Sequence, residues 1–172
     1  MISAGSSIYV YGKKPDGSKF RVALRDPRGD ENSAIGVLTL SDITISTSGD
    51  YERYFEKDGV RYHHILDPRT GYPADSGLMQ VTIISDDSVM GDALSTACFV
   101  SGLDEGMKLA EKYGVDAIFV DTDKNIWYNN PDVLNSFEFT GKDSGYVLNE
   151  YNQLAVEHGA FGPQLLRGKA GF

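Results

Sequence analysis

This sequence has little cysteine, few histidines and no long hydrophobic run. Its single cysteine, Cys98, excludes an internal disulfide and any paired-cysteine metal or redox motif. No stretch approaches the ~18–20 apolar residues that a transmembrane helix needs, and the first residues lack the basic segment and apolar run of a signal peptide. Basic residues are also in deficit, and the formal net charge is −9. Such a surface repels phosphate backbones, so we expect no nucleic-acid partner.

Several catalytic motifs are absent as well. Gly5 and Gly12 are too far apart for a phosphate-binding P-loop, and no Ser or Thr follows Lys13. The sequence contains no GxGxxG, HExxH or GxSxG pattern. What is present is an ordinary globular composition, 41% hydrophobic and 24% charged over 172 residues, which suits one domain.

The order of the expected elements indicates an α+β fold, a mostly antiparallel sheet with two packed helices. Runs of β-forming residues separated by turn residues predict the strands, the first of them as a meander. We expect strands over residues 8–11, 20–25, 37–46, 51–55, 60–66, 78–85, 115–121, 126–128 and 137–140. This pattern predicts a domain over residues 1–145, followed by a peripheral helix or a loose tail over 146–172.

Two stretches have helical spacing. The first helix is expected from Asp86 or Asp87 to about Ser101, and the second from Asp104 to Tyr113, where Gly114 ends it. The apolar face of the first helix is predicted to consist of Val89, Ala93, Leu94, Ala97 and Val100. Cys98 lies in the same apolar stretch, which favours a buried and inert thiol.

Asp92 and Thr96 form the first candidate site. They are four residues apart, so a helix places a carboxylate and a hydroxyl on one face, where both can bind one divalent cation such as Mg²⁺. The alternative is a solvated Asp and a Thr that bonds back to its own helix.

His63 and His64 are the second candidate. Successive side chains of a strand face opposite sides, so one of them can enter a cleft and act in proton transfer. Two edge-strand histidines that hold cross-strand hydrogen bonds are the alternative.

Two polar loops complete the candidate residues. The turn from Asp67 to Pro73 is rigid and leaves a strand end, which suits ligand contact as well as a purely structural role. Thr47 and Ser48 lie in a hydroxyl-rich strand exit that can bind phosphate or flavin through backbone amides, or can be a simple bulge.

Taken in order, these segments resemble one family. The chain reads I-Y-V-Y-G, F-R-V-A-L-R-D-P, S-T-S-G-D-Y-E-R-Y-F, R-Y-H-H-I-L-D-P-R-T-G-Y-P and then G-D-A-L-S-T-A. Over about residues 5–130 this is similar to the C-terminal half of the ApbE-type FAD:protein FMN transferases, which implies the C-terminal portion of an ApbE-like, T-fold-like domain.

The resemblance implies a chemistry and a set of site residues. Such enzymes use Mg²⁺ to transfer FMN from FAD to a Thr or Ser hydroxyl of a flavin-acceptor protein, and they release AMP. By this resemblance Asp92 and Thr96 are metal ligands and His64 is a candidate for proton transfer. The residues that contact the flavin nucleotide are then expected to be Thr47, Ser48, Leu66, Asp67, Thr70 and Gly71.

The sequence also departs from the family pattern. Members are commonly about twice as long, and their D-x-G-G-x-A-K-G segment, which contributes to the metal and adenine sites, does not occur here. We therefore expect the chain alone to be weakly active or inactive. The rival expectations are an FAD-binding or FAD-hydrolysing module, and a non-catalytic fragment that assembles as a homodimer. Any membrane attachment or extracytoplasmic location is expected only through an N-terminal anchor that this sequence does not include.

Overall fold

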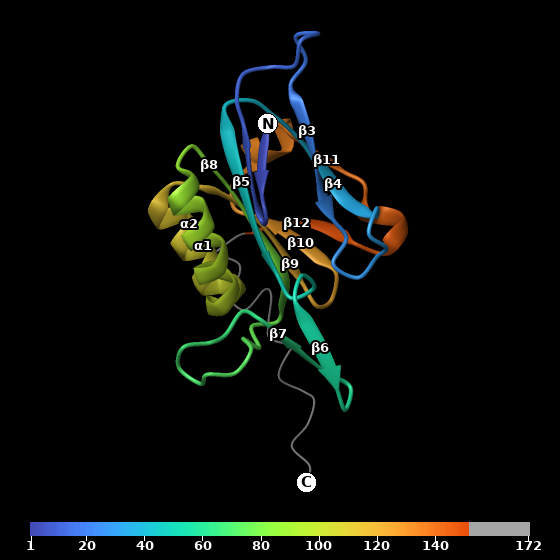
Figure 1. Cartoon of the computed structure of the whole chain (residues 1–172), viewed down its shortest axis with the longest axis vertical. Helices are drawn as coiled ribbons and strands as arrows, with labels where there is room; N and C mark the ends of the chain where they lie inside the picture. Colours follow the sequence, from blue (N-terminus) through green and yellow to red (C-terminus); the bar gives the residue numbers. More distant parts are fainter. Residues whose placement is uncertain (152–172) are drawn as a thin grey trace.

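The structure, a computed structural model, describes residues 1–151 and is built around one large sheet between two other layers (Figure 1). Neighbouring strands of this sheet run antiparallel, except that β10 and β12 are parallel. In spatial order the strands are β1 (Ile2–Ala4), β2 (Ser7–Val10), β5 (Ile43–Gly49), β8 (Leu78–Ser85), β9 (Asp116–Asp121), β10 (Asn125–Tyr128) and β12 (Val147–Glu150).

A three-stranded antiparallel sheet covers one face of the large sheet. It consists of β11 (Phe137–Phe139), β4 (Ala34–Leu40) and β3 (Phe20–Arg25), in that order. Two short 3₁₀ helices, η1 (Pro131–Asn135) and η2 (Gly141–Ser144), flank β11 along the chain. Buried aliphatic and aromatic side chains fill the space between the two sheets, among them Val10, Leu38 and Ile126.

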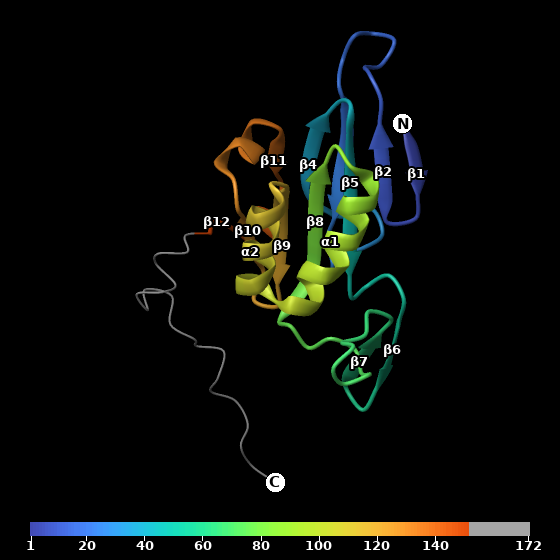
Figure 2. The ribbon, with the colours of Figure 1, turned by 90° about the vertical axis from the view of Figure 1, so that its left-hand side faces the viewer.

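The two helices cover the opposite face, in front of the sheet in Figure 2. Helix α1 (Ser88–Ser101) begins after Asp87, whose carboxylate accepts hydrogen bonds from the next backbone N–H groups, and α2 (Leu103–Tyr113) ends at Gly114 in the left-handed conformation. The buried side chains beneath the helices form a second core, in which Phe99 and Phe119 are fully buried. No helix among residues 1–151 is long and apolar enough to cross a membrane.

A β-hairpin projects from the end of the large sheet (Figures 1 and 2). Its strands are β6 (Tyr54–Lys57) and β7 (Val60–His63), joined at Asp58 and Gly59. Both turn residues have positive φ, as an Asp-Gly hairpin turn requires. The hairpin carries the chain into the segment that holds the predicted histidine and turn residues.

The predicted α+β class is confirmed, and several details differ. The single strand expected over residues 37–46 is two strands in different sheets, because Asp42 adopts a left-handed conformation (φ 55°) and reverses the chain. As a result the first strands do not form a meander: β2 pairs with β5, and β3 pairs with β4. At the other end, β12 extends the large sheet past the predicted boundary at residue 145 to Glu150, and the helix or tail expected beyond it, at 152–172, lies outside the described residues.

The predicted apolar face of α1 is wrong at three of its five positions, while Leu94 is buried and Val100 half-buried. Val89, Ala93 and Ala97 are exposed, whereas the buried positions are Gly91, Leu94, Ser95, Cys98 and Phe99. The helix packs on a polar part of the sheet, formed by Ser46 of β5 and Ser85 of β8, so the side of α1 that faces the sheet is not its most apolar side. A Cβ atom on Gly91 would lie 3.3 Å from Ser46 Oγ, so small residues let α1 approach a polar sheet surface closely.

Candidate metal and flavin site

Strand β5 and helix α1 meet through a row of hydroxyl groups. Ser48 Oγ lies 2.9 Å from Ser95 Oγ and 3.0 Å from Thr96 Oγ1. Strand β2 contributes Ser7, whose hydroxyl donates to Asp92 Oδ1 over 3.0 Å. The helix is therefore fixed to the sheet by polar contacts next to both predicted metal ligands.

Asp92 and Thr96 both face a cleft of about 300 Å³ at this junction. Both residues are exposed, and His64 lines the same cleft. The sequence-based alternative for Thr96 does not hold, because its hydroxyl pairs with Ser48 and not with its own helix. We refer to this space as the His64 cleft; it is lined by Ser6, Thr47, Ser48, Gly49, Glu52, His64, Ile65, Leu66, Asp92 and Thr96.

The two histidines line different clefts, although β7 ends at His63 and His64 lies just beyond the strand. His63 is buried; its Nδ1 accepts a hydrogen bond from the Ile65 N–H (3.3 Å), so its Nε2 carries the proton and donates to the Ala74 carbonyl (3.1 Å). Its ring also packs edge-on against Phe99, with 5.6 Å between the ring centroids. His64 is exposed, and its backbone N–H donates to the Arg53 carbonyl. The buried ring thus fixes the segment from which His64 reaches the cleft.

The turn after Leu66 is held mainly by its own contacts. The Asp67 carboxylate accepts three hydrogen bonds from the Arg69 guanidinium and one from the Arg69 backbone N–H. These bonds lower the pKa of Asp67 below its ordinary value. The Thr70 hydroxyl accepts from the Tyr72 N–H, and Gly71 has a positive φ of 73°.

The predicted flavin-contact residues therefore fall into two groups. Thr47, Ser48 and Leu66 line the His64 cleft, whereas Asp67, Thr70 and Gly71 lie in the adjoining turn. The sequence pattern did not single out the remaining wall residues, Ser6, Gly49, Glu52 and Ile65. Glu52 falls within the S-T-S-G-D-Y-E-R-Y-F segment and Ile65 within R-Y-H-H-I-L-D-P, but neither motif indicates which of its side chains line a cleft, so only the fold reveals these walls.

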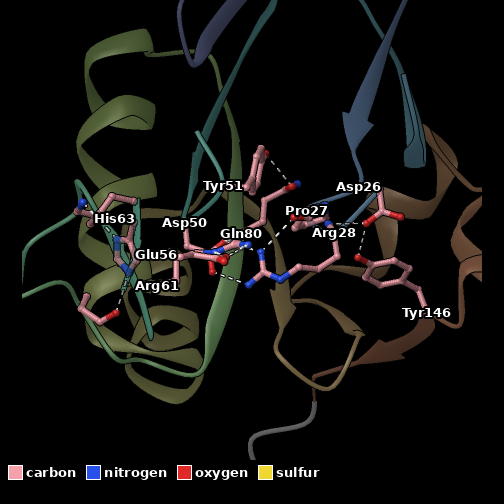
Figure 3. A network of polar contacts seen from close by, with 12 residues as sticks. Asp26, Pro27, Arg28, Asp50, Tyr51, Glu56, Arg61, His63, Gln80 and Tyr146 are labelled. Carbon is pink, nitrogen blue, oxygen red and sulfur yellow. Dashed lines mark hydrogen bonds and ion pairs between the residues drawn. The ribbon is translucent and has the colours of Figure 1, made fainter. Parts of the chain in front are cut away.

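A network of charged and polar groups lies at the end of β5 (Figure 3). The buried Asp50 carboxylate accepts hydrogen bonds from Nη1 and Nη2 of Arg28, over 2.8 and 2.6 Å. Arg61 Nη1 lies 3.8 Å from Asp50 Oδ1. In the same network the Tyr146 hydroxyl donates to Asp26 over 2.6 Å. Burial, followed by this bond, raises the pKa of Tyr146. These contacts join the loop after β3 to the strand exit that forms the cleft wall.

A second, larger cleft of about 430 Å³ lies between the β6–β7 hairpin and the segment that leads into β8. Asp50, Arg61, His63, Tyr72 and Ser76 contribute to its lining. Two of its charged groups, Asp50 and Arg61, are already paired within the protein.

Within residues 1–151, no three His, Cys, Asp or Glu side chains gather into a metal-binding group. The donors that Asp92 and Thr96 present are a carboxylate and a hydroxyl oxygen, the ligand type that hard cations such as Mg²⁺ select. Mg²⁺ usually keeps several waters and takes few protein ligands. The two side chains fit that requirement because they are one helical turn apart and both open to the same cleft.

Comparison with known proteins identifies the class to which this fold and site belong. The model of the ApbE family matches residues 1–119, and the chain belongs to that family. The FAD:protein FMN transferase of Klebsiella pneumoniae (strain 342) is 41% identical over 149 residues, which are 86% of this chain and 44% of the relative. The FAD:protein FMN transferase of Treponema pallidum (strain Nichols) is 39% identical over 135 residues, 73% of this chain and 37% of the relative.

Solved structures agree with this assignment. The ApbE protein from Thermotoga maritima superposes with a TM-score of 0.62 at 38% identity, over 83% of this chain and 42% of that one. The flavin transferase ApbE from Vibrio cholerae gives a TM-score of 0.58 at 29% identity, over 84% and 43%. The family predicted from the sequence motifs is thus confirmed, and the chain spans less than half the length of these relatives.

Proposed function

We propose that this protein acts in the Mg²⁺-dependent transfer of FMN from FAD to a Thr or Ser hydroxyl of a target protein, with release of AMP. The observation that carries the proposal is the His64 cleft, which brings Asp92, Thr96 and His64 together from two distant parts of the chain. The names of the relatives support the same reaction class, since FAD and a protein acceptor are both part of them.

In this proposal Asp92 and Thr96 hold the cation through one carboxylate oxygen and one hydroxyl oxygen. Mg²⁺ bound there would neutralise charge on the phosphate oxygens of FAD during transfer. The helix supplies both ligands from one face, and the hydroxyl contacts with β2 and β5 fix that face against the sheet. Positioning of this kind supplies much of the rate in phosphoryl transfer.

His64 serves as the proton acceptor. The acceptor hydroxyl oxygen forms a bond to the FMN phosphorus, the bond from that phosphorus to the oxygen of AMP breaks, and the hydroxyl proton moves to the imidazole. Thr47, Ser48 and Leu66 form the wall against which the flavin nucleotide would lie, while Asp67, Thr70 and Gly71 shape the adjoining turn.

A binding experiment tests the metal assignment. Mg²⁺ is titrated into the chain in the presence of FAD, and Asp92→Ala is compared with Asp86→Ala, an exposed carboxylate just before the same helix. We expect Asp92→Ala to lose Mg²⁺ binding and Asp86→Ala to retain it. Equal binding by the two variants would refute the assignment.

The products distinguish the transfer reaction from its alternative. Mass spectrometry of a Thr-containing acceptor detects attached FMN, and chromatography detects AMP. AMP together with a flavinylated acceptor supports transfer, and His64→Ala is expected to reduce both products. AMP without a flavinylated acceptor would instead indicate an FAD-hydrolysing module.

A further inference from the structure

The hydroxyl groups between α1 and β5 form a chain whose direction can be derived. A serine or threonine hydroxyl has only one proton to donate. Ser95 donates its proton to the backbone carbonyl of Asp92, over 2.9 Å. The contact between Ser95 and Ser48 must therefore use the Ser48 proton, with Ser95 as the acceptor.

The chain of hydroxyl groups continues from Ser48 to Thr96 in the cleft. Because the Ser48 proton is used at Ser95, Ser48 accepts in its contact with Thr96, and Thr96 is the donor. The Thr96 proton then points toward Ser48 on β5. Its oxygen lone pairs are left for a ligand in the cleft, the state that a hydroxyl needs in order to bind a cation.

A parallel chain fixes the carboxylate. Ser7 donates to Asp92 Oδ1, so its contact with the fully buried Ser46 at 3.0 Å must have Ser46 as the donor. The structure gives Asp92 Oδ2 no hydrogen-bond partner among residues 1–151. One carboxylate oxygen is thus held by the sheet, and the other remains for a ligand.

Close packing makes both chains possible. Gly91 lets α1 approach β5 so closely that a Cβ atom there would lie 3.3 Å from Ser46 Oγ and 3.6 Å from Ser85 Cβ. Ser95 is almost completely buried at this contact. Its hydroxyl is therefore shielded from solvent and donates within the protein, to the Asp92 carbonyl.

We propose that Ser48 and Ser95 are positioning residues that fix the Thr96 hydroxyl as an acceptor toward the metal. The inference rests on the proposed function, since it concerns how the Mg²⁺ ligands are oriented. It also changes the expected role of Ser48, which acts through Thr96 and not primarily on the flavin nucleotide. Ser95 contacts neither the cleft nor the Thr96 hydroxyl, so an effect of Ser95 on Mg²⁺ affinity follows only from the directed chain.

The test measures Mg²⁺ affinity by calorimetry, with and without FAD, and the free energy of unfolding in urea for the same variants. Loss of an outer partner of a metal ligand typically costs 10–100-fold in affinity, so we expect about tenfold weaker binding for both Ser48→Ala and Ser95→Ala. Ser48→Thr keeps the hydroxyl and is expected to restore affinity. Ser101→Ala, an exposed serine at the end of α1, is the matched control.

The outcomes separate this inference from the proposed function. If Asp92→Ala abolishes Mg²⁺ binding while Ser48→Ala and Ser95→Ala bind as the unsubstituted chain does, the directed chain is refuted and the metal site stands. Variants that lose stability in urea but keep their Mg²⁺ affinity also refute it, because they show a structural role alone. If Asp92→Ala binds Mg²⁺ normally, or the unsubstituted chain binds none, the proposed function fails together with this inference.

Discussion

Removal of the Arg28 side chain should cost far more stability than removal of a comparable surface arginine. Arg28 binds Asp50 through two hydrogen bonds, and the Asp50 side chain is only 10% exposed. Loss of one partner of a buried ion pair costs about 3–5 kcal/mol when the remaining charge is left alone. Asp50 keeps Arg61 at 3.8 Å, so we expect the free energy of unfolding to fall by about 2–3 kcal/mol in Arg28→Ala.

Arg21→Ala is the matched control, since it removes the same charge from an exposed pair. The side chains of Arg21 and Glu138 are 58% and 59% exposed, and such pairs contribute about 0–1 kcal/mol. Urea unfolding followed by Trp127 fluorescence measures both variants, and thermal unfolding should show a drop of about 4–12 °C for Arg28→Ala. The double variant Arg28→Ala/Asp50→Ala should lose less than the sum of the single losses. Equal stability of Arg28→Ala and Arg21→Ala would refute the reasoning.

Three further measurements test other parts of the structure. Burial raises the pKa of Cys98 to about 12, so at pH 8 a thiol reagent should label the chain only after unfolding; rapid labelling of the native chain would contradict its buried position. Hydrogen bonds from Arg69 lower the pKa of Asp67, so the contribution of this pair is present above the unfolded pKa of about 3.9 and is lost as the pH falls through the folded value. In an NMR titration Arg69→Ala should therefore raise the Asp67 midpoint, and an unchanged midpoint would argue against the contact. Phe99→Ala removes a fully buried ring that packs on His63 and should cost about 3–5 kcal/mol in urea unfolding, whereas a loss below ~1 kcal/mol would contradict that packing.

Local signals predicted the elements best where a side chain or a glycine fixes the backbone. Asp87 and Gly114 mark helix ends that the structure reproduces, and the strand predicted over residues 78–85 coincides with β8. The break at Asp42 was missed because an aspartate in a left-handed conformation, between two β-forming runs, leaves little trace in the sequence. Periodicity also gives no information about which sheet a strand joins, so the second layer appears only in the structure.

For the candidate site too, local patterns predicted some residues and missed those whose position depends on the whole fold. The spacing of Asp92 and Thr96 predicted two side chains that face one cleft, since it depends on local helix geometry, whereas strand alternation left open which of His63 and His64 would enter it and only the family resemblance singled out His64. Ser95 could not be recognised as a buried polar residue, because its burial depends on the hydroxyl groups of β5 beneath it. The pairing of Arg28 with Asp50 depends on how the loop after β3 folds over the sheet, which no local pattern specifies.

The position of β11 has a consequence for the synthesis of this protein. Strand β11 pairs with β4 in space, but along the sequence the central strands of the large sheet and both helices lie between them. At 5–20 residues per second, a ribosome needs on the order of 5–20 s to complete β11 after β4 has emerged. During that interval the apolar side of the β3–β4 hairpin has neither its third strand nor its finished partner layer. Nascent chains of this protein therefore pass through a period in which a chaperone has an apolar surface to bind, and the three-stranded layer closes late.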